Sequence, residues 1–371
     1  MELFDKCLDL ENSMLGPYIP IMRPKEGELK ALQMLSADTL KQLAPFFDFH
    51  RPPYVKKVRK PFDKHIVDTC RKITKHWNKE GLFFFDLYLI NLKERINTAH
   101  PISWISSYFS KAGYSFVPTI GTDRDDSYLE ALKSAIKDGL ENGICVRLLK
   151  DDLEFPEDTS ETVLSLLNSL EVASIDSHLL IDFKYTKQSD IPAFVEALTN
   201  LGDYLDFSKW MSLTVSGSGF PEDMTGLPAN SITPIPRTEL YLWKSILKLE
   251  PLLGIKPFLS DYCIVHPEAP DVDPVTMRAG GKIRYATKEC WMIFRGYSLQ
   301  KNERYNQYFN LAQQVVNHEC YLGNNTSWGD RHYEECSKNM TTCGNLTTWV
   351  KVDTNHHLTI IAEQVSNLVD S

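Results

Sequence analysis

Three aspartates each follow a run of large apolar residues, in the segments PFFD, FFFD and LLID: Asp48, Asp86 and Asp182. Carboxylate oxygens are ligands that Mg²⁺ accepts in proteins, and two carboxyl groups can form an acid–base pair, as in glycoside hydrolysis. A charge at the end of a buried strand is costly unless it is paired. The aspartates therefore predict either a site or a lattice of ion pairs with Arg23 and Arg147, and both remain open.

Basic residues at other strand ends favour an anionic ligand, because arginine offers a bidentate fork to phosphate or carboxylate. The segment VSGSG is a Gly/Ser turn whose backbone N–H groups could cradle a phosphate, although such a turn is also simply flexible. The candidate catalytic residues are Asp48, Asp86, Asp182 and Glu28, with Glu28 undecided between a helix cap and a site. The candidate ligand-binding residues are Arg23, Lys25, Arg147, Arg237, Glu239, Ser216 and Ser218.

Several other chemistries are disfavoured. The chain has no H-x-H pair, no H-E-x-x-H motif and no compact Cys/His cluster, so no metal site is predicted and cofactors stay unknown. The SGSG turn is not a nucleophile elbow, which disfavours serine hydrolase chemistry. The adjacent His356 and His357 point in different directions on a helix, so a packing or capping role is expected for them. The SWGD segment at 327–330 is typical of a tight turn.

The elements that position these residues follow a rhythm of short strands and amphipathic helices. Eight runs rich in β-branched and aromatic residues predict strands at 18–22, 43–49, 82–88, 115–120, 143–149, 178–185, 210–216 and 257–263. Helices are expected between them, among others at 27–35, 125–143, 158–170, 190–202 and 237–254. Eight alternations predict an α/β fold, a (β/α)8 barrel with a C-terminal helical elaboration, in which functional groups gather at the carboxyl ends of the strands.

Two rival architectures are an open doubly wound sheet and two α/β domains split near residues 150–160. The barrel is preferred because the strand count is eight and no G-x-G-x-x-G turn follows the first strand. The expected organisation is an N-terminal extension at 1–16, a barrel at 17–295 and a helical extension at 296–371 packed on the barrel.

Composition narrows the class of protein. The chain has 371 residues, 43% of them hydrophobic, and a net charge of −9, so the whole molecule is not an obvious nucleic-acid binder. No apolar run approaches the roughly 18 residues of a membrane span. The N-terminal segment is acidic and unlike a secretory signal. With eight scattered cysteines, reduced thiols and a cytoplasmic location are expected.

One segment departs from the acidic average. Residues 51–79 contain ten lysines and arginines against two aspartates. Such a segment is commonly a solvated face, and the alternative is contact with an acidic partner or a nucleic-acid backbone.

The segments YIPIMRPKEGELKAL, LAPFFDFHRPP, LFFFDLY, LLIDFKY, IPRTELYLW and the closing WGD…NHHLT resemble the Beta protein family over about residues 17–365. That family is named after a satellite-phage gene product and occurs in prophages and bacterial defence loci. The resemblance implies a role in phage immunity or prophage exclusion together with a toxin-like or DNA-acting partner protein. It marks as motif positions Lys25, Gly27, Glu28, Asp48, Asp86, Asp182, Arg237, Glu239, His356 and His357.

Two functional classes follow. In the first, the protein is a component of a phage-defence or immunity module, acts with a partner protein and has a polar barrel mouth that binds a phosphate-bearing ligand. In the second, it is a barrel enzyme, a hydrolase acting on a nucleotide or phosphodiester, with the aspartates as acid–base or metal groups and the arginines as anion clamps. The oligomeric state is not predicted.

Overall fold

The computed structural model describes residues 15–55, 57–268, 279–300 and 303–369. Residues 1–14 of the expected N-terminal extension lie outside the described residues. In the described part no helix is both long and apolar enough to cross a bilayer.

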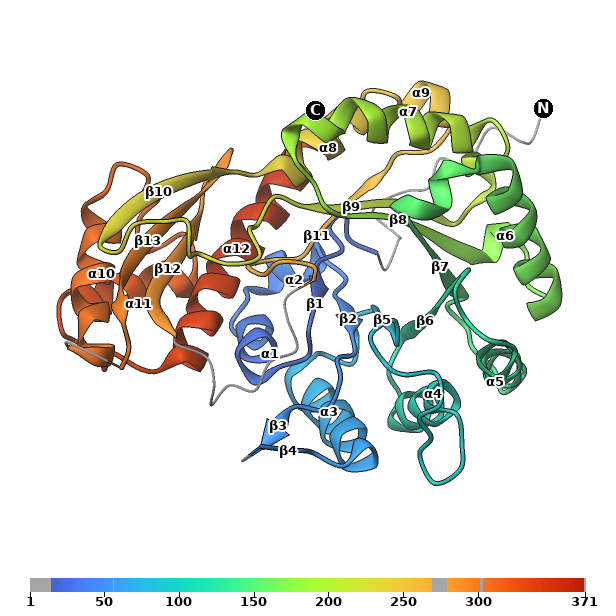
Figure 1. Cartoon of the computed structure of the whole chain (residues 1–371), viewed down its shortest axis with the longest axis horizontal. Coiled ribbons are helices and arrows are strands. Elements are labelled where there is room, and N and C mark those ends of the chain that lie inside the picture. Colours follow the sequence, from blue (N-terminus) through green and yellow to red (C-terminus); the bar gives the residue numbers. More distant parts are fainter. Residues whose placement is uncertain (1–14, 56, 269–278, 301–302, 370–371) are drawn as a thin grey trace.

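Eight parallel strands form the central sheet and neighbour one another in chain order (Figure 1). They are β1 (Ile21–Met22), β2 (Phe46–Asp48), β5 (Phe83–Asp86), β6 (Phe116–Gly121), β7 (Ile144–Leu149), β8 (Ser177–Tyr185), β9 (Ser212–Ser218) and β11 (Phe258–Asp261). A parallel bridge between Tyr18 and Leu259 joins the last strand to the segment before the first. The predicted (β/α)8 barrel is confirmed.

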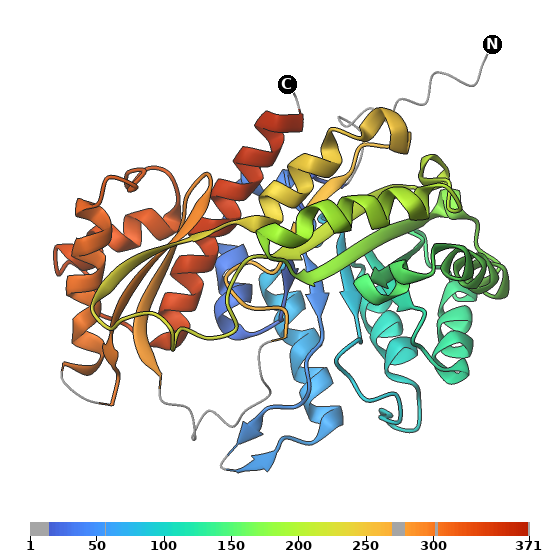
Figure 2. The same ribbon diagram turned by 45° about the horizontal axis from the view of Figure 1, so that its top comes forward.

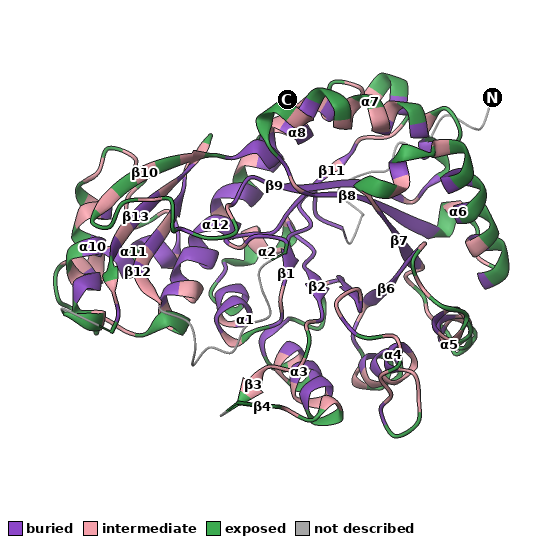
Figure 3. Ribbon diagram, in the orientation of Figure 1, coloured by how far each residue is buried: buried purple, intermediate pink, exposed green. Residues whose placement is uncertain are grey.

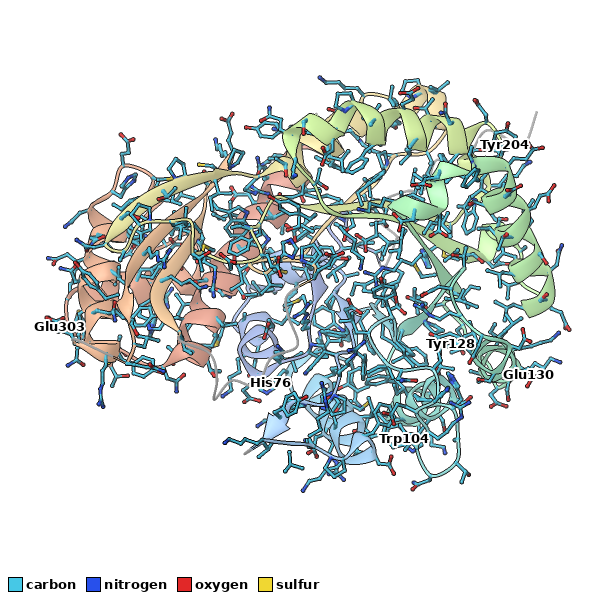
Figure 4. All side chains as sticks on the ribbon, in the orientation of Figure 1. His76, Trp104, Tyr128, Glu130, Tyr204 and Glu303 are labelled. Atoms are coloured by element: carbon cyan, nitrogen blue, oxygen red, sulfur yellow. The ribbon has the colours of Figure 1, made fainter. Side chains whose placement is uncertain are left out.

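Helices cover the outside of the barrel, and their outer faces are exposed while the strands are buried (Figure 3). They are α1 (Glu26–Gln33), α2 (Ala37–Lys41), α3 (Phe62–His76), α4 (Pro101–Ala112), α5 (Asp126–Lys137), α6 (Pro156–Leu170), α7 (Ile191–Gly202), α8 (Thr238–Leu247) and α9 (Glu250–Leu253). The single helix expected at 237–254 is thus divided into α8 and α9. Tyr128 of α5, labelled in Figure 4, donates a 2.6 Å hydrogen bond to the Thr119 carbonyl and so ties its helix to β6.

Alternation along the strands fills the barrel in layers. The apolar interior cluster takes one residue from each of six neighbouring strands: Ile21, Phe46, Phe84, Val117, Cys145 and Leu180. Side chains two residues apart on a strand share a face. The next interior layer toward the carboxyl ends therefore consists of Asp48, Asp86, Thr119, Arg147 and Asp182, all buried. The charged layer of the barrel interior therefore lies directly next to a layer of apolar side chains.

A second lobe stands beside the barrel (Figure 1, left). Its antiparallel sheet has the order β10-β13-β12, from β10 (Ser231–Pro236), β12 (Gly280–Ala286) and β13 (Cys290–Ser298). Its helices are α10 (Gln307–Asn317) and α11 (Trp328–Ser337), whose residues pack with those of the sheet in a separate core. The boundary expected at 295/296 falls inside β13, and β10 comes from the connection between barrel strands β9 and β11. Ser327 caps α11 through its hydroxyl, so the prediction of a tight turn at SWGD is wrong.

Helix α12 (Leu346–Val369) belongs to both cores. Trp349 and Val352 pack in the second lobe, whereas Leu358, Ile361 and Val365 pack in the barrel core. Asn355 lies between these groups and donates to the Ala31 carbonyl of α1 at 3.1 Å. A Cβ at Gly27 of α1 would lie 2.7 Å from Val350 Cγ1, so a glycine is needed where α1 and α12 meet. His356 and His357 therefore lie in the interior of a helix and not at its cap.

A small hairpin projects from the molecule after β2 (Figure 2). It consists of β3 (Tyr54–Val55) and β4 (Val58–Arg59), which pair antiparallel. Lys57 at its tip has a positive φ of 69°. The hairpin leads into α3, so the basic segment 51–79 forms one projecting strand pair and one barrel helix.

Candidate functional site

The charged layer at the barrel mouth is built around Arg147, whose side chain reaches three strands. Its Nη1 donates to Asp86 Oδ2 at 2.7 Å, and its Nη2 donates to Asp182 Oδ2 at 2.7 Å. Nε donates to the same oxygen of Asp182 at 3.1 Å. Arg147 is 2% exposed and Asp86 and Asp182 are fully buried, so this guanidinium neutralises two carboxylates that would otherwise be unpaired in the core.

Two further cations complete the group. Arg124, on the loop after β6, donates to Asp86 Oδ1 at 2.8 Å. Lys184 Nζ lies 3.2 Å from Asp182 Oδ2. The sheet register shifts between Asp182 and Tyr185, and Lys184 has a positive φ of 57°. This bulge turns the lysine back over the aspartate, which is a known use of bulges beside functional sites. We call the group Asp48, Asp86, Arg124, Arg147, Asp182, Lys184 and Tyr262 the mouth cluster.

Two tyrosines enclose the cations. The Tyr88 ring has the Arg147 guanidinium 5.2 Å and the Lys184 ammonium 4.3 Å from its centroid. Tyr262, at the end of β11, donates its hydroxyl proton to Asp182 at 2.5 Å. Tyr262 is buried, whereas Tyr88 is only partly buried, so Tyr88 forms the outer wall of the mouth cluster.

The three carboxylates differ in how their charge is stabilised. Burial opposes ionisation of both Asp86 and Asp182. Arg124 and Arg147 nevertheless hold the pKa of Asp86 below its usual range. Lys184 and Arg147 do the same for the pKa of Asp182. Asp48 has the opposite balance. Burial outweighs Arg147 and Lys184 and raises its pKa.

Asp48 also has unused hydrogen-bonding capacity. Its Oδ1 is buried without a hydrogen-bond partner in the described structure, and the nearest cation, Arg147 Nη1, is 3.8 Å away. Burial, with Arg147 second, lowers the pKa of Lys184. Asp48 and Lys184 also act on each other's charge, and the pKa of Asp48 is raised while that of Lys184 is lowered. Such a pair is typical of functional sites, although structural networks produce it as well.

The charged residues after β1 lie on the loop that follows this strand and in the first turn of α1. Arg23 donates to the Pro267 carbonyl at 3.1 Å. It lowers the pKa of Asp48 less than Arg147 and Lys184 do. Lys25 is the N-cap residue of α1. Glu28, in the first turn of α1, is 7% exposed, and burial raises its pKa against the opposing influence of Lys25. Of the three, Arg23 acts on the mouth cluster, through its effect on the pKa of Asp48, whereas Glu28 acts on the pKa of Cys263.

In the Gly/Ser segment a backbone N–H that could bind a phosphate already donates to another residue of the chain. Ser216 and Ser218 both lie in β9 and are buried. The Gly219 N–H, which could have bound a phosphate, donates to Glu239 Oε2 at 2.9 Å. Arg237 Nε in turn donates to Glu239 Oε1 at 3.1 Å. Arg237 and Glu239 therefore form a buried ion pair at the start of α8, and a carboxylate of the chain already takes the N–H that an anion would use.

A second polar group lies outside the barrel wall, between β11 and α12. Tyr18 donates its hydroxyl proton to Asp261 Oδ1 at 2.7 Å, and His357 Nε2 lies 2.8 Å from Asp261 Oδ2. Cys263 follows two residues after Asp261, and its backbone N–H donates to Oδ1 of that residue at 2.9 Å. The donor atoms of Asp261, Cys263 and His357 lie within 4.8 Å of one another. We call Tyr18, Asp261, Cys263 and His357 the β11–α12 cluster.

His356 serves a different network from its neighbour. Its Nδ1 lies 2.8 Å from Asp330 Oδ2 and its Nε2 lies 2.9 Å from the Ala286 carbonyl. Asp330 also accepts hydrogen bonds from Ser327 and Tyr285. This network joins α11, α12 and β12 in the second lobe, so the expectation that the two histidines point in different directions agrees with their contacts.

Several members of these groups were not predicted from the sequence. Arg124, Tyr88 and Tyr262 lie on loops or strand ends, close to the positions selected as strand exits. The repeated pattern at strand ends was a usable signal. Asp86, Asp182 and Asp261 each accept a hydrogen bond from the backbone N–H two residues later. An aspartate at a strand exit therefore also fixes the turn that presents the following side chains.

Comparison with known families adds one match. A family model described as Beta protein matches residues 18–363 of the chain, nearly its whole length. No curated protein sequence matches the chain. The resemblance inferred from the sequence motifs is thereby confirmed.

Proposed function

The chain belongs to the Beta protein family, and from that premise we propose that it is a component of a bacterial anti-phage defence or prophage immunity module. In this proposal it acts with a partner protein, toxin-like or DNA-acting, and its barrel mouth binds an anionic, phosphate-bearing ligand. The module role rests on what the family resemblance implies, and the ligand rests on the charges of the mouth cluster.

The observation that carries the ligand proposal is the position of Lys184. An ammonium group has three donors, and Lys184 Nζ makes one carboxylate contact, to Asp182. It lies against the Tyr88 ring, which is the partly exposed wall of the cluster. Arg147, in contrast, already donates from all three guanidinium nitrogens to protein oxygens. Lys184 is therefore a cation with donors left for a ligand at the carboxyl ends of the strands, where barrel proteins bind their ligands. Arg124 Nε also lacks a partner among the described residues, but the other two nitrogens of that guanidinium donate to Asp86 and Asp123.

We expect Lys184→Met to abolish ligand binding and phage protection while the protein stays folded. Thermal unfolding with inorganic phosphate and with ATP provides the measurement, since a ligand present at about 100 times its dissociation constant stabilises a protein by roughly 2.7 kcal/mol. Wild type should show a ligand-dependent rise in Tm, and the variant should show none. Lys209→Met, at an exposed lysine that pairs with Asp206, is the matched control and should behave as wild type. Full protection by Lys184→Met would refute the proposal.

A second candidate function is hydrolysis of a nucleotide or phosphodiester, and the Asp48–Lys184 pair favours it. A carboxyl group with a raised pKa and an amine with a lowered pKa are suited to general acid–base catalysis. In this alternative Asp48 is the acid–base group, and Lys184 neutralises the phosphate. In this alternative Arg147, which pairs with both Asp86 and Asp182, supplies the positive charge between these aspartates.

The partner or nucleic acid is proposed to bind the basic segment 51–79. Lys57 at the hairpin tip and Lys64 in α3 are both exposed, and Val55 and Val58 add exposed apolar surface on the hairpin. If this surface binds a phosphate backbone, charge reversal of Lys57 and Lys64 to glutamate should weaken binding to a DNA duplex. The slope of log K against log salt should then fall by about one for each phosphate that is no longer neutralised. Fluorescence anisotropy over a salt series measures both effects. An unchanged slope, equal to that of Lys209→Glu, would exclude this surface as the nucleic-acid binding site.

A further inference from the structure

The three-stranded sheet of the second lobe (Figure 1) has two different faces. One face packs on α10, α11 and α12 through an apolar core. On the other face Trp291 and Ile293 pack with residues of the connections after β9 and β11, among them Phe220. Residues two apart on a strand share a face, so this second face continues along β13 from Ile293 to Arg295 and Tyr297. Apolar contacts with the barrel thus take up one end of the face, and polar residues follow at the other end.

The strand register places one polar residue from each strand in a row across this face. Ser231 of β10 pairs with Arg295 of β13, and Arg295 pairs with Lys282 of β12. Arg284 follows two residues after Lys282 and shares its face. The Cα atoms of paired residues in an antiparallel sheet are about 4.5–5.5 Å apart. Lys282 and Arg295 are therefore neighbouring like charges, an arrangement that destabilises a sheet on its own.

Positive charge on this face exceeds negative charge. Arg284 donates from Nη1 to Asp353 Oδ2 at 2.7 Å and from its backbone N–H to the same oxygen at 3.2 Å. The other oxygen of Asp353 accepts a hydrogen bond from Tyr333 at 2.9 Å, so this carboxylate is engaged through both oxygens. The side chains of Lys282 and Arg295 form no ion pair with any residue that the structure describes.

Lys282 is a cation with little compensation for its charge. Its side chain is partly buried, and burial first, then Arg284, lower its pKa to about 7 against the opposing charge of Asp353. The other charged groups that act on it are Arg295 of β13 and Asp223 of the connection between β9 and β10. A further negative charge beside this amine would stabilise its protonated form.

We propose that Lys282, Arg295 and Tyr297, which we call the lobe face, form a docking site for an acidic segment of a partner protein. Side-chain carboxylates of that segment pair with Lys282 and Arg295, as the Asp353 carboxylate pairs with Arg284 on the same face of the sheet. Tyr297 is 46% exposed and adds an aromatic contact beside the two cations. Tyrosine and arginine are enriched in protein interfaces and among the residues that contribute most to binding.

The size of the lobe face favours a polypeptide over a nucleic acid. Its two cations come from paired positions about 5 Å apart, whereas proteins that bind a duplex neutralise several phosphates along the backbone. A carboxylate side chain can reach both cations at once. The lobe face shares no residue with the mouth cluster or with the basic segment 51–79. That the partner belongs to a defence module rests on the proposed function, but the binding of an acidic segment does not.

The test is fluorescence anisotropy of a short fluorescein-labelled polyglutamate peptide with the full-length protein. The protein carries Lys57→Glu and Lys64→Glu, so that these two exposed lysines of the basic segment do not bind the probe. Polyglutamate should bind and polyglutamine should not. Lys282→Met and Arg295→Met should each raise the Kd at least about tenfold. Lys288→Met, at an exposed lysine between β12 and β13, is the matched control and should leave the Kd unchanged.

Two further measurements separate binding from a structural role. Lys282→Met removes a charge without an ion-pair partner among the described residues, so its Tm should not fall below that of the parent protein. The affinity of the parent protein should decrease as the pH rises through about 7, where Lys282 loses its proton. In Lys282→Met this dependence should be absent. A loss of binding that accompanies unfolding of Lys282→Met would contradict the proposal.

Other outcomes would overturn the assignment as well. Binding that is absent, or that Lys288→Met weakens as much as Lys282→Met does, refutes the lobe face as the site. Displacement by free glutamate at the same carboxylate concentration would make it a small-molecule site, and displacement by a DNA duplex would make it a nucleic-acid site. A rise in Tm with inorganic phosphate that persists in Lys184→Met and disappears in Lys282→Met would assign a phosphate to this face instead. Failure of the Lys184→Met test alone concerns the mouth cluster and leaves the peptide result unchanged.

Discussion

Replacing Arg147 by methionine is expected to lower the free energy of unfolding by about 3–5 kcal/mol, the range seen when one partner of a buried ion pair is removed. The variant leaves Asp86 and Asp182 in the barrel interior without their central cation. Both have pKa values held low partly by Arg147, so in the variant each must either stay ionised without a partner or take up a proton. Urea denaturation followed by far-ultraviolet circular dichroism measures the change.

The control for the Arg147→Met variant is the removal of one partner of an ion pair at the surface. Lys209 and Asp206 form one with side chains 73% and 50% exposed, and Lys209→Met should cost no more than about 1 kcal/mol. A loss of under about 1 kcal/mol for Arg147→Met as well would mean that the mouth cluster does not stabilise the fold. The slope of unfolding free energy against urea should be similar in both variants if each changes stability alone.

Asp48→Asn is expected to abolish phage protection without destabilising the protein at neutral pH. Burial raises the pKa of Asp48 in the folded state. The folded protein therefore binds this proton more tightly than the unfolded chain, and stability falls as pH rises through the interval between the two pKa values. Above that interval the ionised group carries a cost, which asparagine removes. A lost function with a retained or raised Tm is the expected result.

The same variant separates the two candidate functions. If the protein is a hydrolase with Asp48 as its acid–base group, turnover should fall by about 10²–10⁴, while the Tm shift caused by ATP stays close to that of wild type. If the barrel mouth only binds a ligand, protection should change in parallel with that Tm shift. Thr119→Val, at another buried polar residue of the same interior layer, is the matched control. Full protection by Asp48→Asn would exclude a functional role for this carboxylate.

Much of the barrel could be predicted from the strands alone. Their apolar runs are nearly continuous because both faces are buried, one against the barrel interior and one against helices. Alternation then places Asp48, Asp86, Arg147 and Asp182 in one layer. The pairing of an arginine with these aspartates could therefore be predicted from the sequence, and Arg147 does pair with Asp86 and Asp182. Arg23 donates instead to the Pro267 carbonyl, because it lies on the loop beyond β1 and not in the interior layer.

The second lobe was harder to predict for a physical reason. Strand β10, with the sequence SITPIP, contains two prolines, which lower strand propensity. It pairs with β13, more than fifty positions later, so no local hairpin signal exists. The segments GGKIRYA and CWMIFRGYS, which form β12 and β13, were not predicted as strands because eight strands already completed the predicted barrel before them. The β11–α12 cluster was missed for a similar reason, since its donors converge only when α12 returns to the barrel.

Helix α12 also sets the order in which the molecule can be completed during synthesis. Asn355 of α12 donates a hydrogen bond to Ala31 of α1, 324 positions earlier in the chain. Helix α12 therefore packs on α1 only after nearly the whole chain has been made. At translation rates of about 5–20 residues per second, the apolar face of α1 waits on the order of 15–60 s on the ribosome for its partner. Until then the face of α1 that carries Gly27 and Ala31 lacks the cover that α12 provides in the finished protein and is open to chaperones. Docking of α12 on α1 is thus one of the last events of folding.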